Sequence, residues 1–195
     1  MYAGCGLSAP TCFHARMGSQ LTFTRVEDGE ASALADWLAS EAWPFHARTN
    51  WTPEDALKSI RAGDFSGTNP TYWVGSERHG RVGIVHYRYM DDVTPDVDLR
   101  LAAAFRGHGL GTQMVEWAAA NLFTETDKHR LAGETRVDNS AMRRAFLRCR
   151  WVEEAHYRQS WPVGDGRWID SVGYAILRSD WEANRASDGS TGDRT

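Results

Sequence analysis

FRGHGLGTQM, residues 105–114, places glycine at positions 107, 109 and 111, immediately before a segment with the pattern of a helix. Glycine loses more backbone freedom on folding than any other residue, so three glycines disfavour the start of a helix. Between a strand and a helix, however, glycines let backbone N–H groups approach an anion at the positive end of the helix, because no Cβ stands in the way. The stretch therefore predicts an anion-binding turn, and the alternative is a flexible loop.

Two other phosphate-binding turns do not match this stretch. A P-loop closes with Gly-Lys followed by Ser or Thr, whereas Leu110, Gly111 and Thr112 stand there in this chain. A dinucleotide-binding fingerprint would have its third glycine at position 112 and would follow the first strand of a parallel sheet. Position 112 is Thr, and a long region with strands of its own precedes the turn. The sequence therefore argues against both nucleotide-binding motifs.

Outward from the turn, strands and helices follow one another along the chain. Period-two patterns predict strands, and helical periodicity with capping signals predicts helices. The expected strands are residues 20–26, 71–77, 81–90, 97–103, 129–137, 151–161 and 168–178, and the expected helices are residues 28–42, 52–63, 138–149 and a segment from the turn to about residue 123. Thr52 and Pro53 give the clearest helix start, an N-cap hydroxyl followed by a first-turn proline. This order predicts a mixed α/β domain.

The composition bounds the number of domains. A chain of 195 residues that is 42% hydrophobic and 25% charged can form one globular domain with a proper core. The residues before Met17 are rich in Gly, Ser, Ala and Pro, and the chain ends in SDGSTGDRT. We therefore expect a flexible extension over 1–19, one folded domain over 20–184 and a disordered tail over 185–195.

Charge and residue usage exclude several classes of function. The net charge of −4 gives no basic footprint for nucleic acid. No stretch approaches the roughly 20 apolar residues of a membrane span. Cys5, Cys12 and Cys149 follow no disulfide or zinc pattern, and the seven histidines lack ligand spacing. We therefore expect no metal, no membrane or nucleic-acid partner, and a reducing cytoplasmic location.

At this point the sequence resembles a known superfamily. Arg106–Gly111 matches the Arg/Gln-x-x-Gly-x-Gly/Ala pyrophosphate loop of the GNAT superfamily of acyl-CoA-dependent N-acyltransferases, which lies after their fourth strand. Asn139 opens the next helix, where the superfamily has its second coenzyme A motif, and VGYAILRSDW resembles the branch with ribosomal-protein N-terminal and small-molecule acetyltransferases. The resemblance implies a mixed α/β fold of the α+β type, with a mostly antiparallel twisted sheet, splayed fourth and fifth strands, and flanking helices.

The resemblance also implies how acetyl-CoA, the co-substrate, is held. Backbone amides of the turn would bind the pyrophosphate, with Arg106 adding charge. The splayed fourth strand would pair with the pantetheine arm as though that arm were another strand. Asn139 would reach the arm from the other side, and its alternative role is an ordinary helix N-cap. The implied contacts are Leu99, Arg100, Leu101, Arg106, Gly107, His108, Gly109, Leu110, Gly111, Thr112 and Asn139.

Acyl transfer to an amine requires a base, because only the neutral amine can attack the thioester. In one branch of the superfamily a base Glu lies five positions before the motif Asn, which here is Glu134. Strand alternation places Glu134 on the face opposite Leu131 and Thr135. Its alternative is a solvated carboxylate paired to Arg130 or Arg136.

A second base candidate is Asp98, on the fourth strand near the expected acyl group. Its alternative is a salt bridge to Arg100 or another basic side chain. Either carboxylate would need a pKa raised from about 4 toward neutrality to act as a base.

Two residues depart from the family pattern. Many members have a Tyr seven residues after the motif Asn that protonates the departing thiolate, and this chain has Phe146. A phenyl ring donates no proton, so water or another residue such as Tyr157 would take the role. Arg150 stands where the usual Gly ends the helix, so the turn there is strained or different.

The acceptor site is implied to lie between the N-terminal helices and the last hairpin. There Trp43, Phe45 and Trp51 would wall the acceptor pocket, and the alternative for each is core packing. We predict an N-acetyltransferase that acts by direct attack in a ternary complex on a small-molecule or peptide amine. The alternative is a non-catalytic acyl-CoA-binding sensor or structural module, and homodimers are common in the superfamily.

Overall fold

The computed structural model of the chain describes residues 21–190, with side chains up to residue 187. The strands are β1 (Leu21–Arg25), β2 (Thr71–Ser76), β3 (Gly80–Arg88), β4 (Asp96–Leu101), β5 (Arg130–Arg136), β6 (Val152–Gly164) and β7 (Arg167–Leu177). The helices are η1 (Asp28–Glu30), α1 (Ala31–Ala39), α2 (Pro53–Arg61), η2 (Ala103–Phe105), α3 (Leu110–Glu125), α4 (Ser140–Arg148) and α5 (Arg178–Ser190). Thr52 caps α2 by accepting a hydrogen bond from the Asp55 amide, as predicted. The extension expected over 1–19, with Cys5 and Cys12, lies outside the described residues.

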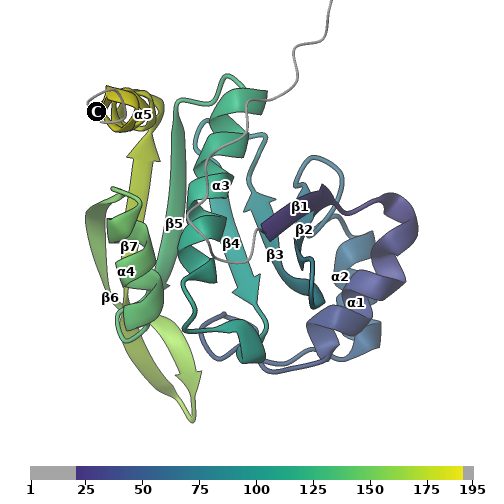
Figure 1. Ribbon diagram of the computed structural model, residues 1–195. Coiled ribbons are helices and arrows are strands. Elements are labelled where there is room, and N and C mark those ends of the chain that lie inside the picture. Colours follow the sequence, from purple (N-terminus) through teal and green to yellow (C-terminus); the bar gives the residue numbers. More distant parts are fainter. Residues whose placement is uncertain (1–20, 191–195) are drawn as a thin grey trace, which may run out of the picture.

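The strands form one sheet in the order β1-β2-β3-β4-β5-β7-β6, and every neighbouring pair is antiparallel except β4 and β5. The parallel pair shares a single register contact, Asp96 with Ala132. Beyond it the two strands diverge toward their C-terminal ends (Figure 1). The predicted splay between the fourth and fifth strands is therefore confirmed.

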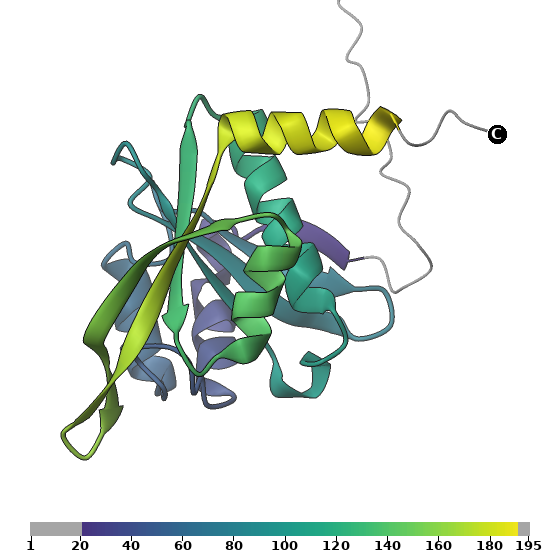
Figure 2. The same ribbon diagram turned by 90° about the vertical axis from the view of Figure 1, so that its left-hand side faces the viewer.

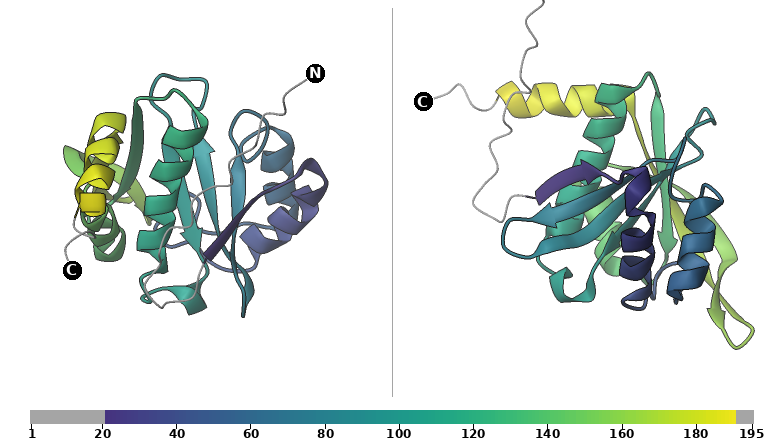
Figure 3. Two further views of the ribbon diagram at one scale, coloured as in Figure 1. Left: turned by 45° about the horizontal axis from the view of Figure 1, so that its top comes forward. Right: turned by 90° about the vertical axis from the view of Figure 1, so that its right-hand side faces the viewer.

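Helices cover both faces of this sheet (Figure 3). Alternate residues of β2 and β3 explain why, since Val74 and Val85 join the core under α3 and α4, whereas Trp73 and Ile84 join a second core under α1 and α2. The β6–β7 hairpin extends beyond the rest of the sheet (Figure 2). The mixed α/β architecture that the sequence predicted is thus confirmed.

A C-terminal helix, α5, crosses the boundary that the sequence placed between residues 184 and 185. The predicted tail over 185–195 is helical as far as Ser190, because α5 continues directly from β7 and packs across the end of α3. Trp181 lies on this helix with its ring centroid 5.6 Å from that of Phe123. The packing of Trp181 thus holds α5 against the domain, although the polar residues at the end of this helix had suggested disorder.

The turn after α4 is strained, as Arg150 in place of glycine suggested. Arg150 has a φ of 61°, in the left-handed region that favours glycine. Its guanidinium donates to Asn184 Oδ1 at 3.0 Å and to Ser187 Oγ at 3.2 Å, both on α5. These contacts link the end of α4 to the C-terminal helix.

Candidate functional site

The glycine-rich turn lies between β4 and α3, where the sequence placed it. Gly107 and Gly109 have φ values of 83° and 80°, which an L side chain rarely adopts, and Gly109 is the N-cap of α3. Gly111 has no positive φ, and a Cβ built there would meet nothing within 4 Å. The first turn of α3 has no acidic residue, and the N-terminal N–H groups of a helix attract anions. The turn is therefore shaped for an anion, and at Gly111 the fold itself does not require glycine.

The gap between β4 and β5 exposes backbone polar groups of β4. The Ala102 amide donates to the Val82 carbonyl on β3 at 2.9 Å. Because successive residues of a strand point their backbone groups to opposite sides, Leu99 and Leu101 direct theirs away from β3, into the gap. The amides of this edge can pair with an extended, amide-bearing ligand, whereas the Leu99 and Leu101 carbonyls accept hydrogen bonds from His46 Nε2 and Arg106 Nε.

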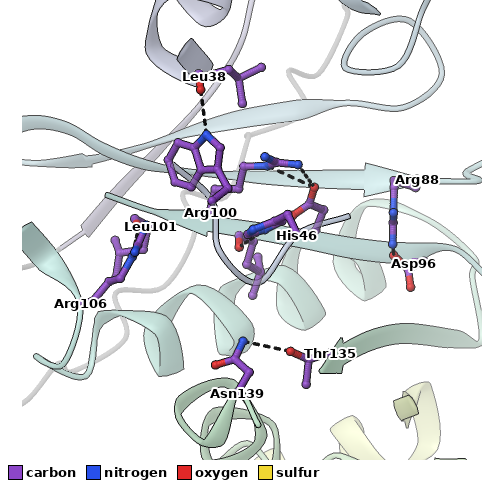
Figure 4. Close-up of polar contacts among 12 residues, drawn as sticks. Leu38, His46, Arg88, Asp96, Arg100, Leu101, Arg106, Thr135 and Asn139 are labelled. Carbon is purple, nitrogen blue, oxygen red and sulfur yellow. Dashed lines mark hydrogen bonds and ion pairs between the residues drawn. The ribbon is translucent and has the colours of Figure 1, made fainter. Parts of the chain in front are cut away.

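Arg106 does not point toward the anion-binding turn. Its Nε donates to the Leu101 carbonyl at 2.8 Å, and its Nη2 donates to Glu41 Oε2 at 3.1 Å. Glu41 Oε2 also accepts from the Ala103 amide at 2.8 Å. Arg106 therefore ties the loop after α1 to the end of β4 (Figure 4), and its contact with pyrophosphate stays a prediction.

Asn139 caps α4. Its side-chain oxygen accepts from the Met142 amide at 3.2 Å, and its nitrogen donates to Thr135 Oγ1 at 3.0 Å. The structure therefore supports the N-cap alternative, which leaves a contact with the ligand open as a prediction.

A cavity of about 110 Å³ lies on the α1/α2 face of the sheet, where β4 and β5 part. Glu134 and Tyr157, two of the predicted catalytic residues, both line it. Glu134 Oε1 accepts a hydrogen bond from the Ser171 hydroxyl. Neither expected arginine holds this carboxylate, since the partners are Glu154 for Arg130 and Asp138 for Arg136. Among the described residues the ion-pair alternative for Glu134 is thus not realised.

Asp96 also lines this cavity, and the sequence argument missed it. Both side-chain hydrogen bonds from Arg88 go to Oδ1, so Oδ2 has no hydrogen bond among the described residues. Burial raises the pKa of Asp96 to about 6, although Arg88 opposes the shift. The sequence could have indicated Asp96, because strand alternation places it on the same face of β4 as Asp98.

Asp98 lies one step further along the same face, outside the cavity lining. Its carboxylate contacts Arg100 Nη2 at 2.9 Å and His46 Nε2 at 2.9 Å. Burial alone would raise the pKa of Asp98, but Arg100 and His46 outweigh burial and hold the pKa well below its usual range. The structure thus favours the salt-bridge alternative for Asp98 over its role as a base.

Next to β4, His86 on β3 is buried and neutral. Its Nδ1 donates to Thr71 Oγ1 at 3.0 Å, and that hydroxyl donates to the Phe65 carbonyl at 2.8 Å. Burial lowers the pKa of His86 to about 4, although Asp98 opposes the shift.

We expect His86 to make the fold acid-sensitive. Because its folded pKa lies below the usual 6.5, its contribution is intact above that pH and is lost as the pH falls toward 4. The loss is about 3 kcal/mol in the free energy of unfolding. Urea unfolding across this range should show a shallower acid loss for His86→Gln than for wild type, whereas His129→Gln, at an exposed position, should follow wild type. Equal slopes for all three proteins would contradict the assignment.

Comparison with known proteins agrees with this geometry. The family model of the acetyltransferase (GNAT) domain matches residues 20–152. The chain belongs to the GNAT acetyltransferase family. Membership confirms the predicted class of activity, acetyl transfer from acetyl-CoA to an amine.

Solved structures of this fold include a spermidine N-acetyltransferase from Vibrio cholerae in complex with CoA and spermine. It is 18% identical with a TM-score of 0.67, over 84% of this chain and 98% of that one. A GNAT-family acetyltransferase from Bacillus anthracis is 16% identical with a TM-score of 0.68, over 83% and 98% of the two chains. At these identities the likeness shows the fold, and it extends over nearly the whole of the two solved structures and over 83–84% of this chain.

Phe146, at the position of the GNAT tyrosine, is a core residue. It is 1% exposed and stacks on Tyr174 with a centroid distance of 4.9 Å. A Cβ built on Gly133 of β5 would lie 2.7 Å from Phe146 Cζ, so the tip of the ring abuts the strand. The side chain fills space and offers no proton to a leaving group.

The predicted wall of the acceptor pocket is mostly core. Trp43 is 1% exposed and donates from Nε1 to the Leu38 carbonyl at 2.8 Å. Trp51 packs at the edge of the second core, against Phe65. Phe45 is half-buried, with the Arg136 guanidinium 5.1 Å from its ring centroid. The structure thus supports core packing for both tryptophans, and Phe45 stays a candidate wall residue beside the gap.

No helix in residues 21–190 is long and apolar enough to cross a membrane. Within the same residues, no group of three or more His, Cys, Asp or Glu side chains could hold a metal ion.

Proposed function

We propose that this GNAT enzyme acetylates a primary amine that reaches acetyl-CoA as a cation. The observation that carries the proposal is the placement of two unlike sites along one strand. A turn of bare amides, suited to a pyrophosphate, follows β4, and a cavity lined by three carboxylates lies at the start of β4. Arg130 pairs with one of them, Glu154, which leaves Asp96 and Glu134 to meet a cation. An anion and a cation can therefore meet along the gap.

The chemistry follows from the two carboxylates. Each keeps one oxygen without a hydrogen bond among the described residues, Oδ2 of Asp96 and Oε2 of Glu134, so together they can hold an ammonium group. Glu134 is exposed and can pass a proton from the ammonium to solvent. The neutral amine then attacks the thioester carbonyl carbon directly in a ternary complex, and Tyr157 borders the acceptor.

The remaining assignments belong to the same proposal. The turn from Gly107 to Thr112 and the gap-facing backbone around Leu99 and Leu101 hold acetyl-CoA, with Asn139 opposite. The enzyme works without a metal in a reducing cytoplasm, as a homodimer, on an amine and on neither nucleic acid nor membrane. The complex of similar fold that holds spermine, a polycation, makes polyamines the first acceptors to try.

The direct test is release of free thiol from acetyl-CoA across an amine panel of polyamines, an aminoglycoside, peptides with free N-termini and small metabolic amines. We expect turnover with at least one cationic amine and formation of its acetylated product. If CoA binds while the whole panel stays silent, the proposal falls and the non-catalytic acyl-CoA sensor takes its place.

Asp96 gives this proposal a pH signature. With a pKa of about 6, its carboxylate is charged above that pH and becomes protonated below it, so the KM for the amine should rise as the pH falls through this range. Asp96→Asn should raise the KM for the amine about 10-fold near neutral pH. It should also remove the rise of this KM as the pH falls. Asp64→Asn, in the loop after α2 and outside the cavity lining, should match wild type. A KM for Asp96→Asn that equals the wild-type value would remove Asp96 from the acceptor site.

A further inference from the structure

His46 reaches the edge of β4 from the loop between α1 and α2. Its Nε2 lies 2.9 Å from Asp98 Oδ1 and 3.3 Å from the Leu99 carbonyl oxygen, which faces the gap. Figure 4 shows His46 near Arg100 of β4. Alternate residues on one face of a strand are about 7 Å apart, so Asp98 holds His46 one step from Asp96 on the way to the glycine-rich turn. His46 therefore stands between the acceptor cavity and the cofactor turn.

The hydrogen bonds of His46 fix its tautomer. Asp98 Oδ1 and the Leu99 carbonyl are both acceptors, so Nε2 carries a hydrogen and donates it. Neutral His46 consequently has its lone pair on Nδ1. That nitrogen is buried and has no hydrogen-bond partner among the described residues. A buried polar atom without a partner calls for an explanation, and a proton-transfer role is one.

We propose that His46 carries the proton from the attacking nitrogen to the departing sulfur, with Asp98 as its positioning residue. The proposal rests on the acetyl transfer proposed above and names a step that the carboxylate cavity leaves open. Attack by the neutral amine forms the C–N bond and leaves a positive charge on nitrogen. His46 Nδ1 takes this proton, the C–S bond breaks with its electron pair on sulfur, and the imidazolium returns the proton to the thiolate. The products are the amide and free CoA thiol, and His46 is neutral again.

This role suits His46 better than its neighbours. Glu134 is exposed and removes the earlier proton, which goes to solvent, whereas the proton of the second step must stay beside the sulfur. Phe146 has no proton to give, and Tyr157 lies over Gly173 on the β6–β7 side of the cavity. The negative charge of Asp98 stabilises the imidazolium, as the orienting carboxylate does in a catalytic triad.

The charged groups that surround this dyad bear on its pH dependence. They are Arg100 and Asp96 on β4, Arg88 and His86 on β3, Arg136 on β5, and Arg106 with Glu41 at the end of the loop. The pKa of Asp98 is held well below its usual range, so its carboxylate stays charged beside His46.

The test compares His46→Gln with wild type on an amine that wild type acetylates. Gln keeps a donor for Asp98 but cannot shuttle a proton, so kcat should fall about 100-fold to 1000-fold while both KM values stay within about threefold. His156→Gln is the matched control, because His156 forms a similar pair with Asp170 at 2.6 Å on the exposed hairpin.

Two results would overturn the proposal. One is a His46→Gln enzyme with wild-type kcat and pH profile, above all if Tyr157→Phe loses the activity instead. The other is a loss confined to KM for acetyl-CoA or to melting temperature, which marks a structural role. Nitrogen-15 NMR of the wild-type ring gives a readout without turnover, and a proton on Nδ1 of neutral His46 would exclude the proposed tautomer even if no amine were acetylated.

Discussion

A Gly111→Trp variant should lose CoA affinity by about 100-fold or more and keep the wild-type fold. Gly111 has an ordinary backbone conformation and open space where its Cβ would be, so a larger side chain strains neither the chain nor a neighbour. The same open space lies at the first turn of α3, where the pyrophosphate is proposed to bind. An indole ring there would cover the amides, and titration calorimetry with CoA would measure the loss.

The other glycines and an alanine variant make this test specific. Gly109→Trp should lose both affinity and stability, because position 109 has a φ of 80° that only glycine adopts without strain. Gly111→Ala should bind CoA within about threefold of wild type, since one methyl group leaves the amides accessible. Wild-type affinity in Gly111→Trp would place the cofactor elsewhere.

These three glycines show what sequence reasoning could deduce. Each element around the turn had its own local signal, such as the alternation of Val97, Leu99 and Leu101 or the Thr52–Pro53 cap, and these elements form as predicted. The splay of β4 from β5 followed from the family resemblance, and the single Asp96–Ala132 contact confirms it. Local patterning thus sufficed for the order of elements.

The acceptor side depended on contacts between distant segments, which no local pattern records. Asp96 and Asp98 look alike in the sequence, but burial without a full set of partners raises the pKa of one, while Arg100 and His46 lower that of the other. His46 meets Asp98 across 52 positions of the chain only because the α1–α2 loop folds over β4. For the same reason Trp43, a plausible pocket wall in the sequence, lies in the core.

Glu134→Gln should lower kcat for the acetylated amine by about 100-fold at neutral pH. Gln is nearly isosteric and keeps an oxygen for the Ser171 hydroxyl, so the cavity should retain its shape while the proton acceptor is lost. The KM for acetyl-CoA should not change, because Glu134 lies on the acceptor side of the gap. Steady-state kinetics with thiol detection would measure both parameters.

The pH dependence of the deficit separates a base from a residue that only shapes the cavity. As the pH rises toward the pKa of the free amine, neutral amine forms in solution and needs no base, so the rate of Glu134→Gln should approach that of wild type. A shape defect would persist at every pH. Glu153→Gln is the matched control, because Glu153 contacts Tyr174 and Arg143 on the α4 side of the sheet and should leave the profile unchanged. A loss of rate in Glu134→Gln that is the same at every pH would assign the base to Asp96 instead. Asp96 is the other carboxylate in the cavity with an oxygen that has no hydrogen bond among the described residues.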